Sequence, residues 1–198
     1  MSRDNIIALL LFTVAGAFTP GPNTIMVTAS GNAFGFARSL PHIFGVTIGF
    51  ALMLALFGLG LGRVFQTYPA IHESLRYLGA AYLLYLAWRL AQAGNLNAAE
   101  TTRRPLSVVD GALFQWVNPK AVTLAIGVVA SFTTVGGDLW TELAIIVAVF
   151  AVMTLVSLFV WCLFGMAIRR FLSSPRALRI TSLSMAGLLA ASVVLLFV

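Results

Sequence analysis

The chain has 198 residues, of which 60% are hydrophobic and 9% are charged. About a quarter of the residues of a soluble domain are charged, so this composition excludes a water-soluble globular protein and indicates an integral membrane protein. The net charge of +6 does not predict nucleic-acid binding, because such binding needs basic residues clustered on a water-facing surface.

Six apolar runs approach or exceed the roughly 20 residues of helix that cross a bilayer. They are residues 5–36, 41–62, 69–90, 109–132, 139–166 and 178–198. We therefore expect an all-α fold with six transmembrane helices. The first run is too long for one straight helix and carries Thr-Pro-Gly-Pro-Asn near its middle, so we expect it to be broken there.

A polar segment, residues 91–108, divides the chain into two halves with three predicted spans each, residues 1–90 and 109–198. Because each half crosses the bilayer an odd number of times, the two halves must have opposite orientations. The sequence therefore predicts one transmembrane domain, residues 1–198, that is built from two inverted repeats joined by a cytoplasmic linker.

Basic residues are distributed unevenly between the two ends of the predicted spans. One end has Arg38, Arg89, Arg103, Arg104, Arg169, Arg170, Arg176 and Arg179, and the other has Arg3, Arg63 and Arg76. An excess of Lys and Arg marks the cytoplasmic side of a membrane protein. We therefore predict a multi-pass protein with both termini outside the cytoplasm.

A helix breaker lies within the first predicted span, where Pro20, Gly21 and Pro22 precede Asn23. A proline inside a helix removes a backbone hydrogen bond and costs about 3 kcal/mol or more. Lipid offers no water to the freed carbonyl groups, so such backbone is tolerated only against protein or along a wet cavity. We expect these four residues to face the interior of the helix bundle.

The fourth predicted span contains a similar interruption at Asn118, Pro119 and Lys120. Pro119 follows Pro22 by 97 residues, about half of the chain. Proline-interrupted segments at matching places of two inverted halves point to the binding site of a transporter. The half-helices that follow such breaks present N-terminal amides to an anionic group.

Lys120 lies about ten residues into the fourth span, which is roughly 15 Å deep at 1.5 Å per residue. A charge at that depth costs at least about 2.5–3.5 kcal/mol and usually marks a pathway or a ligand counter-ion. The acidic residues closest to the spans lie near span ends: Glu73, Asp110, Asp138 and Glu142. We therefore expect a substrate carboxylate to pair with Lys120. The structural alternative is a set of simple proline kinks with a lysine that extends to the interface.

The other chemically reactive residues predict no enzyme. Cys162 lies in an apolar run and is expected to act as a small hydrophobe. His42 and His72 lie near predicted span ends and are expected at the interface, too far apart in sequence to suggest a metal site. No nucleophile with a base at a suitable spacing is found, so we expect no catalytic residue, metal or cofactor.

Four segments match the pattern of a known family. They are FTPGPNTIMV, GNAFGFAR, LRYLGAAYLLYLAWRL and GALFQWVNPKAV. On these motifs the whole chain resembles the LysE/RhtB family of amino-acid exporters. FQWVN and GAAYLLYLAW are more similar to its cysteine and O-acetylserine exporters than to its lysine exporters. The resemblance implies export from the bacterial cytoplasm across the inner membrane, driven by the proton motive force, with protons as partners.

The resemblance also implies roles for particular residues. The substrate-binding residues would be Pro20, Gly21, Pro22, Asn23, Asn118, Pro119, Lys120 and Tyr82. Gly45, Gly49 and Gly79 would allow close helix packing, either within one chain or between two copies. We predict a secondary transporter for a small, neutral amino acid or a close metabolite. The alternatives are a channel or a carrier for another small solute, and a scaffold with kinked helices.

Overall fold

The computed structural model describes residues 1–61, 67, 69–93, 104–134, 136–171, 175–191 and 193–194. The helices are α1 (Arg3–Phe18), α2 (Pro22–Phe34), α3 (Phe36–Leu56), the π-helix η1 (Phe57–Leu61), α5 (Pro69–Ala93), α6 (Val108–Val117), α7 (Pro119–Phe132), α8 (Leu139–Phe171) and α9 (Pro175–Ala191). Throughout the described residues the regular structure is helical, as the composition and the long apolar runs predict.

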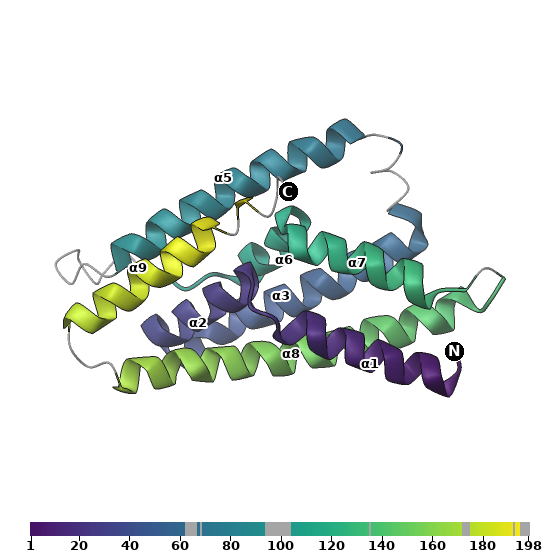
Figure 1. Ribbon diagram of the computed structural model, residues 1–198, viewed down its shortest axis with the longest axis horizontal. Helices are drawn as coiled ribbons and strands as arrows, with labels where there is room; N and C mark the ends of the chain where they lie inside the picture. The colour runs from purple at the N-terminus through teal and green to yellow at the C-terminus, as the bar shows by residue number, and fades with distance from the viewer. Residues whose placement is uncertain are drawn as a thin grey trace.

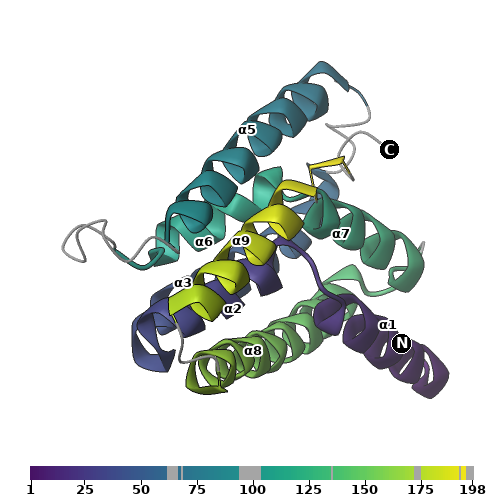
Figure 2. The same ribbon diagram turned by 60° about the vertical axis from the view of Figure 1, so that its left-hand side comes forward.

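The helices run lengthwise between the two ends of an elongated molecule (Figure 1). α1 and α2 together lead to the end at which α3 and α9 begin, and α8 runs in the same direction as α1 and α2. α2 packs against α8, α3 packs against α6 and α8, and α5 packs against α9. In Figure 2, α5 lies on the side of the molecule opposite to α8, and α1 projects away from the bundle.

Two helices are long and apolar enough to cross a membrane, at Phe36–Gly60 and Leu139–Arg170. The pair α1 with α2 and the pair α6 with α7 pass the same criterion only when each bent pair counts as one span. The described residues thus contain two candidate spans, or up to four. The third and sixth predicted spans are present as the helices α5 and α9, which do not reach that criterion, so the six-span inverted repeat stays a prediction.

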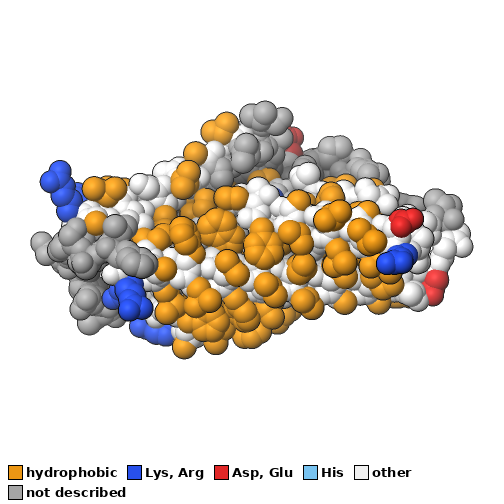
Figure 3. Space-filling view, turned by 60° about the horizontal axis from the view of Figure 1, so that its bottom comes forward, with side chains coloured by type: hydrophobic (Ala, Val, Ile, Leu, Met, Phe, Trp, Pro, Cys, Tyr) orange, Lys and Arg blue, Asp and Glu red, His pale blue; other side chains and the backbone are white. Residues whose placement is uncertain are grey.

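The surface is arranged like that of a protein surrounded by lipid. In Figure 3, hydrophobic side chains cover the middle of the molecule, most of the visible Lys and Arg side chains gather at one end, and most of the visible acidic side chains lie toward the other. Large hydrophobic side chains that are more than half exposed include Leu11, Ile48, Leu113 and Val152. Soluble monomers rarely expose contiguous apolar patches above a few hundred Å², so this surface supports a membrane location.

Both predicted interruptions are breaks between separate helices. α1 ends at Phe18 and α2 begins at Pro22, with a bend of 54°, while α6 ends at Val117 and α7 begins at Pro119, with a bend of 70°. Each proline occupies the first turn of the second helix, where its missing N–H would have had no intrahelical acceptor. The prolines therefore begin new half-helices and do not merely kink continuous ones.

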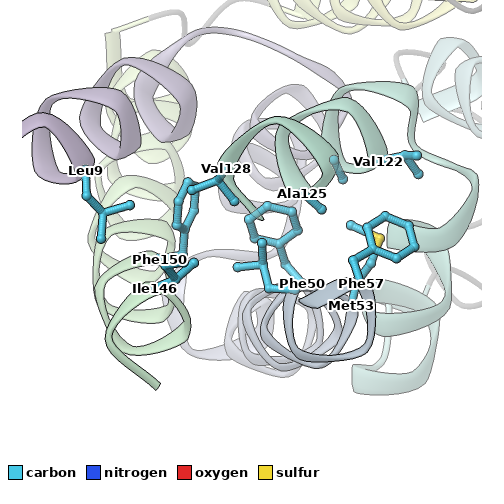
Figure 4. Packing of buried hydrophobic residues seen from close by; sticks show 11 residues of the cluster. Leu9, Phe50, Met53, Phe57, Val122, Ala125, Val128, Ile146 and Phe150 are labelled. Carbon is cyan, nitrogen blue, oxygen red and sulfur yellow. The ribbon is translucent and has the colours of Figure 1, made fainter. Parts of the chain in front are cut away.

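The largest buried cluster holds α7 against α1, α3 and α8 (Figure 4). Its labelled members are Leu9, Phe50, Met53, Phe57, Val122, Ala125, Val128, Ile146 and Phe150. The rings of Phe50 and Phe150 meet edge to face, with their centroids 5.5 Å apart. Because Val122 and Ala125 belong to the first two turns of α7, this packing fixes the position of the helix N-terminus that carries Lys120.

Glycines on α3 and α5 allow close contact with α6. A Cβ atom on Gly45 would collide with the backbone of α6, and one on Gly49 would lie 2.5 Å from Ala112 Cα. A Cβ atom on Gly79 would likewise collide with the backbone at Val117. The predicted packing glycines therefore all contact α6 within one chain.

The prediction that His42 lies at an interface is wrong. The side chain of His42 is 0% exposed, and it lies in the second turn of α3, which begins at Phe36 and continues through Pro41. The sequence misled us because Pro41 resembled the start of a span. In the structure the helix begins before Pro41, at Phe36, so His42 lies in its second turn. The side chain of His72 and the predicted positions of Arg63, Arg103 and residues 195–198 lie outside the described residues.

Candidate functional site

The two helix breaks lie against each other, although they are far apart in sequence. The Lys120 ammonium group donates a hydrogen bond to the carbonyl oxygen of Thr19 in the first break. A Cβ atom on Gly21 would lie 2.9 Å from Lys120 Cδ. Because Gly21 has no side chain, the Lys120 side chain can pass beside it to the first break. The two breaks therefore form one site.

A pair of side-chain amides joins the same two breaks. Asn23 Nδ2 donates to Gln115 Oε1 at 2.8 Å, and Gln115 Nε2 donates to the Gly111 carbonyl oxygen at 2.8 Å and to Asn23 Oδ1 at 3.3 Å. Gln115 is 0% exposed. Because its oxygen and its amide hydrogens all have partners, Gln115 ties the beginning of α2 firmly to α6.

The sequence analysis missed Gln115 as a site residue. It lies in the quoted segment FQWVN, three residues before Asn118, and α6 brings it to the same side of the break. A polar amide within an apolar segment, one helical turn from the break, was the available signal. Its partner could not be read from the sequence because Asn23 lies 92 residues away.

A small cavity of about 50 Å³ lies between the breaks. Its polar lining consists of Asn23, Thr24, Gln115, Asn118, Lys120 and Thr154. Apolar residues that complete it include Val46, Phe50 and Phe150. Since one water molecule needs about 10–15 Å³ of such volume, this cavity holds a few waters and not a whole amino acid.

Asn118 brings an unsatisfied acceptor to this cavity. Its side chain is 1% exposed, and its Oδ1 atom has no hydrogen-bond partner among the described residues. As the N-cap residue of α7 it would ordinarily accept a backbone N–H from Lys120 or Ala121, yet it makes no such bond. A buried acceptor without a partner costs about 1–3 kcal/mol. The N-terminus of α7 therefore offers an unused acceptor beside uncapped N–H groups.

A wide groove of about 900 Å³ lies on the other side of Lys120. The residues of the breaks that line it are Thr19, Pro20, Gly21, Pro22, Pro119 and Lys120. Apolar side chains of α8 and α9, among them Trp161, Phe164 and Leu188, form another part of its wall. Lys120, Gly21 and Thr24 line both hollows. The Lys120 side chain therefore lies between the small cavity and the groove.

The structure brings all the predicted break residues together and leaves Tyr82 apart. Each of Pro20, Gly21, Pro22, Asn23, Asn118, Pro119 and Lys120 lines the cavity, the groove or both. Tyr82 lines neither of these two hollows. Its ring lies 5.7 Å from that of Phe114 and belongs to the cluster between α5, α6 and α9. Tyr82 thus takes part in the packing of these helices.

Comparison with known proteins agrees with the two motifs at the breaks. The family described as LysE type translocator matches residues 14–198. Cysteine/O-acetylserine efflux proteins of Salmonella choleraesuis (strain SC-B67) and Salmonella typhimurium (strain LT2) are 34% identical over 128 residues, 63% of this chain and 64% of theirs. One from Escherichia coli O1:K1 is 29% identical over 133 residues, 67% of each chain.

The aligned region thus spans a little under two thirds of the Salmonella proteins, at 64% of their length. No solved structure shows a match to the chain. The family match, by contrast, covers nearly the whole chain and includes both breaks. The chain belongs to the family of LysE type translocators.

Proposed function

We propose that the chain is a secondary transporter that exports a small, neutral amino acid or a close metabolite from the cytoplasm, driven by the proton motive force. The family and the printed names of the relatives support export of an amino acid. The observation that carries the proposal is that Lys120 and the uncapped N-cap residue Asn118, both at the start of α7, line one small cavity between the two breaks.

The substrate carboxylate binds to Lys120 and to the backbone N–H groups at the start of α7. The carboxylate replaces the Thr19 carbonyl oxygen as the acceptor for the Lys120 ammonium group. Hydrogen bonds to charged groups contribute about 1.5–3 kcal/mol, and a helix N-terminus adds favourable dipole energy. The bound substrate thus gives Lys120 an anionic partner. Among the described residues, no carboxylate lies within hydrogen-bond reach of Lys120.

The substrate ammonium group binds to Asn118 Oδ1, which is the acceptor left without a partner. Asn23, whose position is fixed by Gln115, contacts a further polar group of the substrate. A neutral amino acid supplies one anion and one cation, and so satisfies Lys120 and Asn118 together. A substrate with a cationic side chain would bring a second positive charge near Lys120, which favours neutral substrates.

Export requires that the site opens to each side of the membrane in turn. We propose that six spans form two inverted repeats, with both termini outside the bacterial inner membrane, and that one repeat rocks against the other about the breaks. Two observations support this arrangement. α3 and α6 run in the same direction, since Gly45 and Gly49 lie against Val108 and Ala112 in turn, and the basic residues near their starts, Arg38 and Arg104, are both exposed.

Counterflow in proteoliposomes tests the proposed function. Vesicles are loaded with unlabelled cysteine, O-acetylserine, threonine, homoserine, leucine or lysine, and entry of the labelled amino acid is measured against empty vesicles. We expect trans-stimulation by at least one neutral amino acid and none by lysine. A channel would pass solute without trans-stimulation, and a scaffold would pass none. Either result across the whole panel would contradict the proposal.

A further inference from the structure

One layer of residues, which we call the partition, separates the small cavity from the wide groove. The residues that line both hollows, and so form the partition, are Gly16, Gly21, Thr24, Lys120 and Leu124. A Cβ atom on Gly16 would lie 3.0 Å from Leu124 Cδ2, and one on Gly21 would lie 2.9 Å from Lys120 Cδ. Two flexible side chains of α7 therefore lie against two residues that have no side chain.

The cavity has room for the part that all amino acids share. Its volume of about 50 Å³ corresponds to about three to five water molecules. The head group of an amino acid, which comprises the ammonium group, the α-carbon and the carboxylate, is of similar size. The polar lining, with Asn118 and Lys120, suits this charged head group. A side chain longer than a methyl group must therefore lie elsewhere.

The groove provides the adjoining space, and much of its wall is apolar. Its volume is about 900 Å³. α8 contributes Trp161 and Phe164, whose rings meet edge to face with centroids 5.8 Å apart, and α9 contributes Met185 and Leu188. Burial against such a wall favours an apolar side chain. A cationic side chain would meet Lys120 there, and no acidic residue is found among the described residues that line the groove.

We propose that the groove is the side-chain subsite of this transporter, and that its substrates are neutral amino acids with an apolar side chain. The proposal rests on the transport function proposed above. The head group binds in the cavity, and the side chain passes through the partition into the groove. Thr19, which accepts the hydrogen bond of Lys120, lines the groove and not the cavity. When the substrate carboxylate replaces Thr19 as the acceptor, the Lys120 ammonium group leaves the groove side of the partition.

A lipid acyl chain is the other candidate for an apolar groove in a membrane protein. The residues of the breaks argue against lipid. Lys120 lines the groove, and a cation against acyl chains is costly. The interrupted backbone at Thr19 and Pro20 also lines it, and such backbone is tolerated only against protein or along a wet cavity. A groove that receives an amino acid from water meets both conditions.

Competition by a series of straight-chain amino acids tests the subsite. Alanine, α-aminobutyrate, norvaline and norleucine share one head group, and each is longer than the one before by one CH₂ group. Their inhibition constants are measured against wild-type counterflow of a labelled substrate that the counterflow panel identifies. Full burial of one CH₂ group strengthens binding by about fourfold. We therefore expect the inhibition constant to fall by about two- to fourfold at each step.

The same series gives the results that would overturn the proposal. An inhibition constant that stays level or rises with chain length would show that the side chain does not enter the groove, as expected if lipid fills it. Absence of wild-type counterflow with every amino acid of the panel would instead overturn the transport function.

Trp161→Ala removes a large apolar side chain that lines the groove and not the cavity. We expect the inhibition constant of norleucine to rise by about fivefold and that of alanine to stay at the wild-type value. Unchanged inhibition by alanine also shows that the variant is folded. If Trp161→Ala does not fold, Leu188→Ala makes the same comparison, with an expected rise of about twofold for norleucine. A rise of equal size for both compounds, or none for norleucine, would overturn the proposal.

Trp140→Ala is the matched control. Trp140 belongs to the same helix, is 71% exposed and lines neither the cavity nor the groove. We expect the inhibition constants of all four amino acids to stay at their wild-type values in Trp140→Ala. Loss of the dependence on chain length in this variant as well would assign the effect to general damage of α8 and overturn the role of Trp161.

Discussion

The two helix breaks have related sequences, Pro-Gly-Pro-Asn and Asn-Pro-Lys, but they satisfy their backbone groups in different ways. At the first break, the Gly21 N–H donates to Thr24 Oγ1 at 2.8 Å, and the Thr24 hydroxyl donates back to the Gly21 carbonyl oxygen at 2.9 Å. At the second break, Asn118 holds the N-cap position without making a cap bond. The first break is thus closed, in that Gly21 is satisfied within the break, and the second is open, in that Asn118 Oδ1 has no partner among the described residues.

This difference assigns distinct roles to the two breaks. The first break satisfies Gly21 without a ligand, whereas the second has a buried acceptor that gains the most from a bound group. Under the proposed function, the first break therefore acts as a support and the second as the place where a ligand binds. Lys120 and Gln115 belong to the second break and each bonds the first, so a change at either residue acts on both breaks.

The largest effect on transport is expected from Lys120→Met, which removes the cation of the open break. Loss of a hydrogen bond to a charged group is worth about 1.5–3 kcal/mol, and we expect kcat/KM for counterflow to fall by about 10- to 100-fold. Lys120→Arg keeps the charge with a different geometry and is expected to retain part of the activity. Export by Lys120→Met at the wild-type rate would remove Lys120 from the mechanism.

Gln115→Leu tests the connection between the two breaks. The substitution leaves Asn23 without its partner, and an unsatisfied buried amide costs about 1–3 kcal/mol. We expect a lower free energy of unfolding together with weaker substrate affinity, because Asn23 is no longer fixed at the cavity. Gln115→Glu keeps the acceptor for Asn23 and serves as the comparison. Unchanged unfolding of Gln115→Leu, measured by thermal denaturation in detergent, would contradict the proposed connection.

The pair Asn118→Leu and Thr24→Val tests the comparison itself. Thr24→Val removes the hydroxyl that bonds Gly21 N and O in the closed break, and we expect it to lower the free energy of unfolding by about 1 kcal/mol. Asn118→Leu removes an acceptor that has no partner, so it should leave stability unchanged and weaken substrate binding by about tenfold. The test is to measure thermal unfolding and KM for counterflow on both variants. Lower stability of Asn118→Leu together with weaker substrate binding by Thr24→Val would contradict the roles given to the two breaks.

The smallest effect is expected from Gly21→Ala, which crowds Lys120 from the side of the closed break. Gly21 is in an extended conformation, so alanine causes no backbone strain there. The new methyl group meets the flexible stem of Lys120, which can move aside, and stability should change by less than about 1 kcal/mol. We expect a modest rise in KM. Gly187→Ala, where a Cβ atom meets nothing within 4 Å, is the control and should leave KM unchanged.

The sequence predicts the helices and both breaks because apolar length and prolines are local signals. It also predicts that Lys120 needs a partner, since a charge within a membrane span is costly in any fold. The difference between the breaks could not be predicted in this way. Thr24 and Asn118 can both bond nearby backbone groups, and only the packing around them decides which one does so.

The same limit explains the residues that sequence reasoning misplaced. The Gln115 partner is distant in sequence, and the burial of His42 depends on the contact between α3 and α6. Tyr82 was selected by resemblance; its ring packs against that of Phe114, and its role in substrate binding stays a prediction. In each case the decisive information is a contact between helices, which a single sequence with regular apolar runs does not specify.

The most direct test of the open break compares an exported amino acid with the amine that lacks its carboxylate, both as inhibitors of counterflow. If Lys120 and the N-terminus of α7 hold the carboxylate, the amino acid should inhibit the wild type strongly and the amine should not. The difference between the two compounds should disappear in Lys120→Met, as in a double-mutant cycle. Equal inhibition of the wild type by the amine and the amino acid would contradict the account.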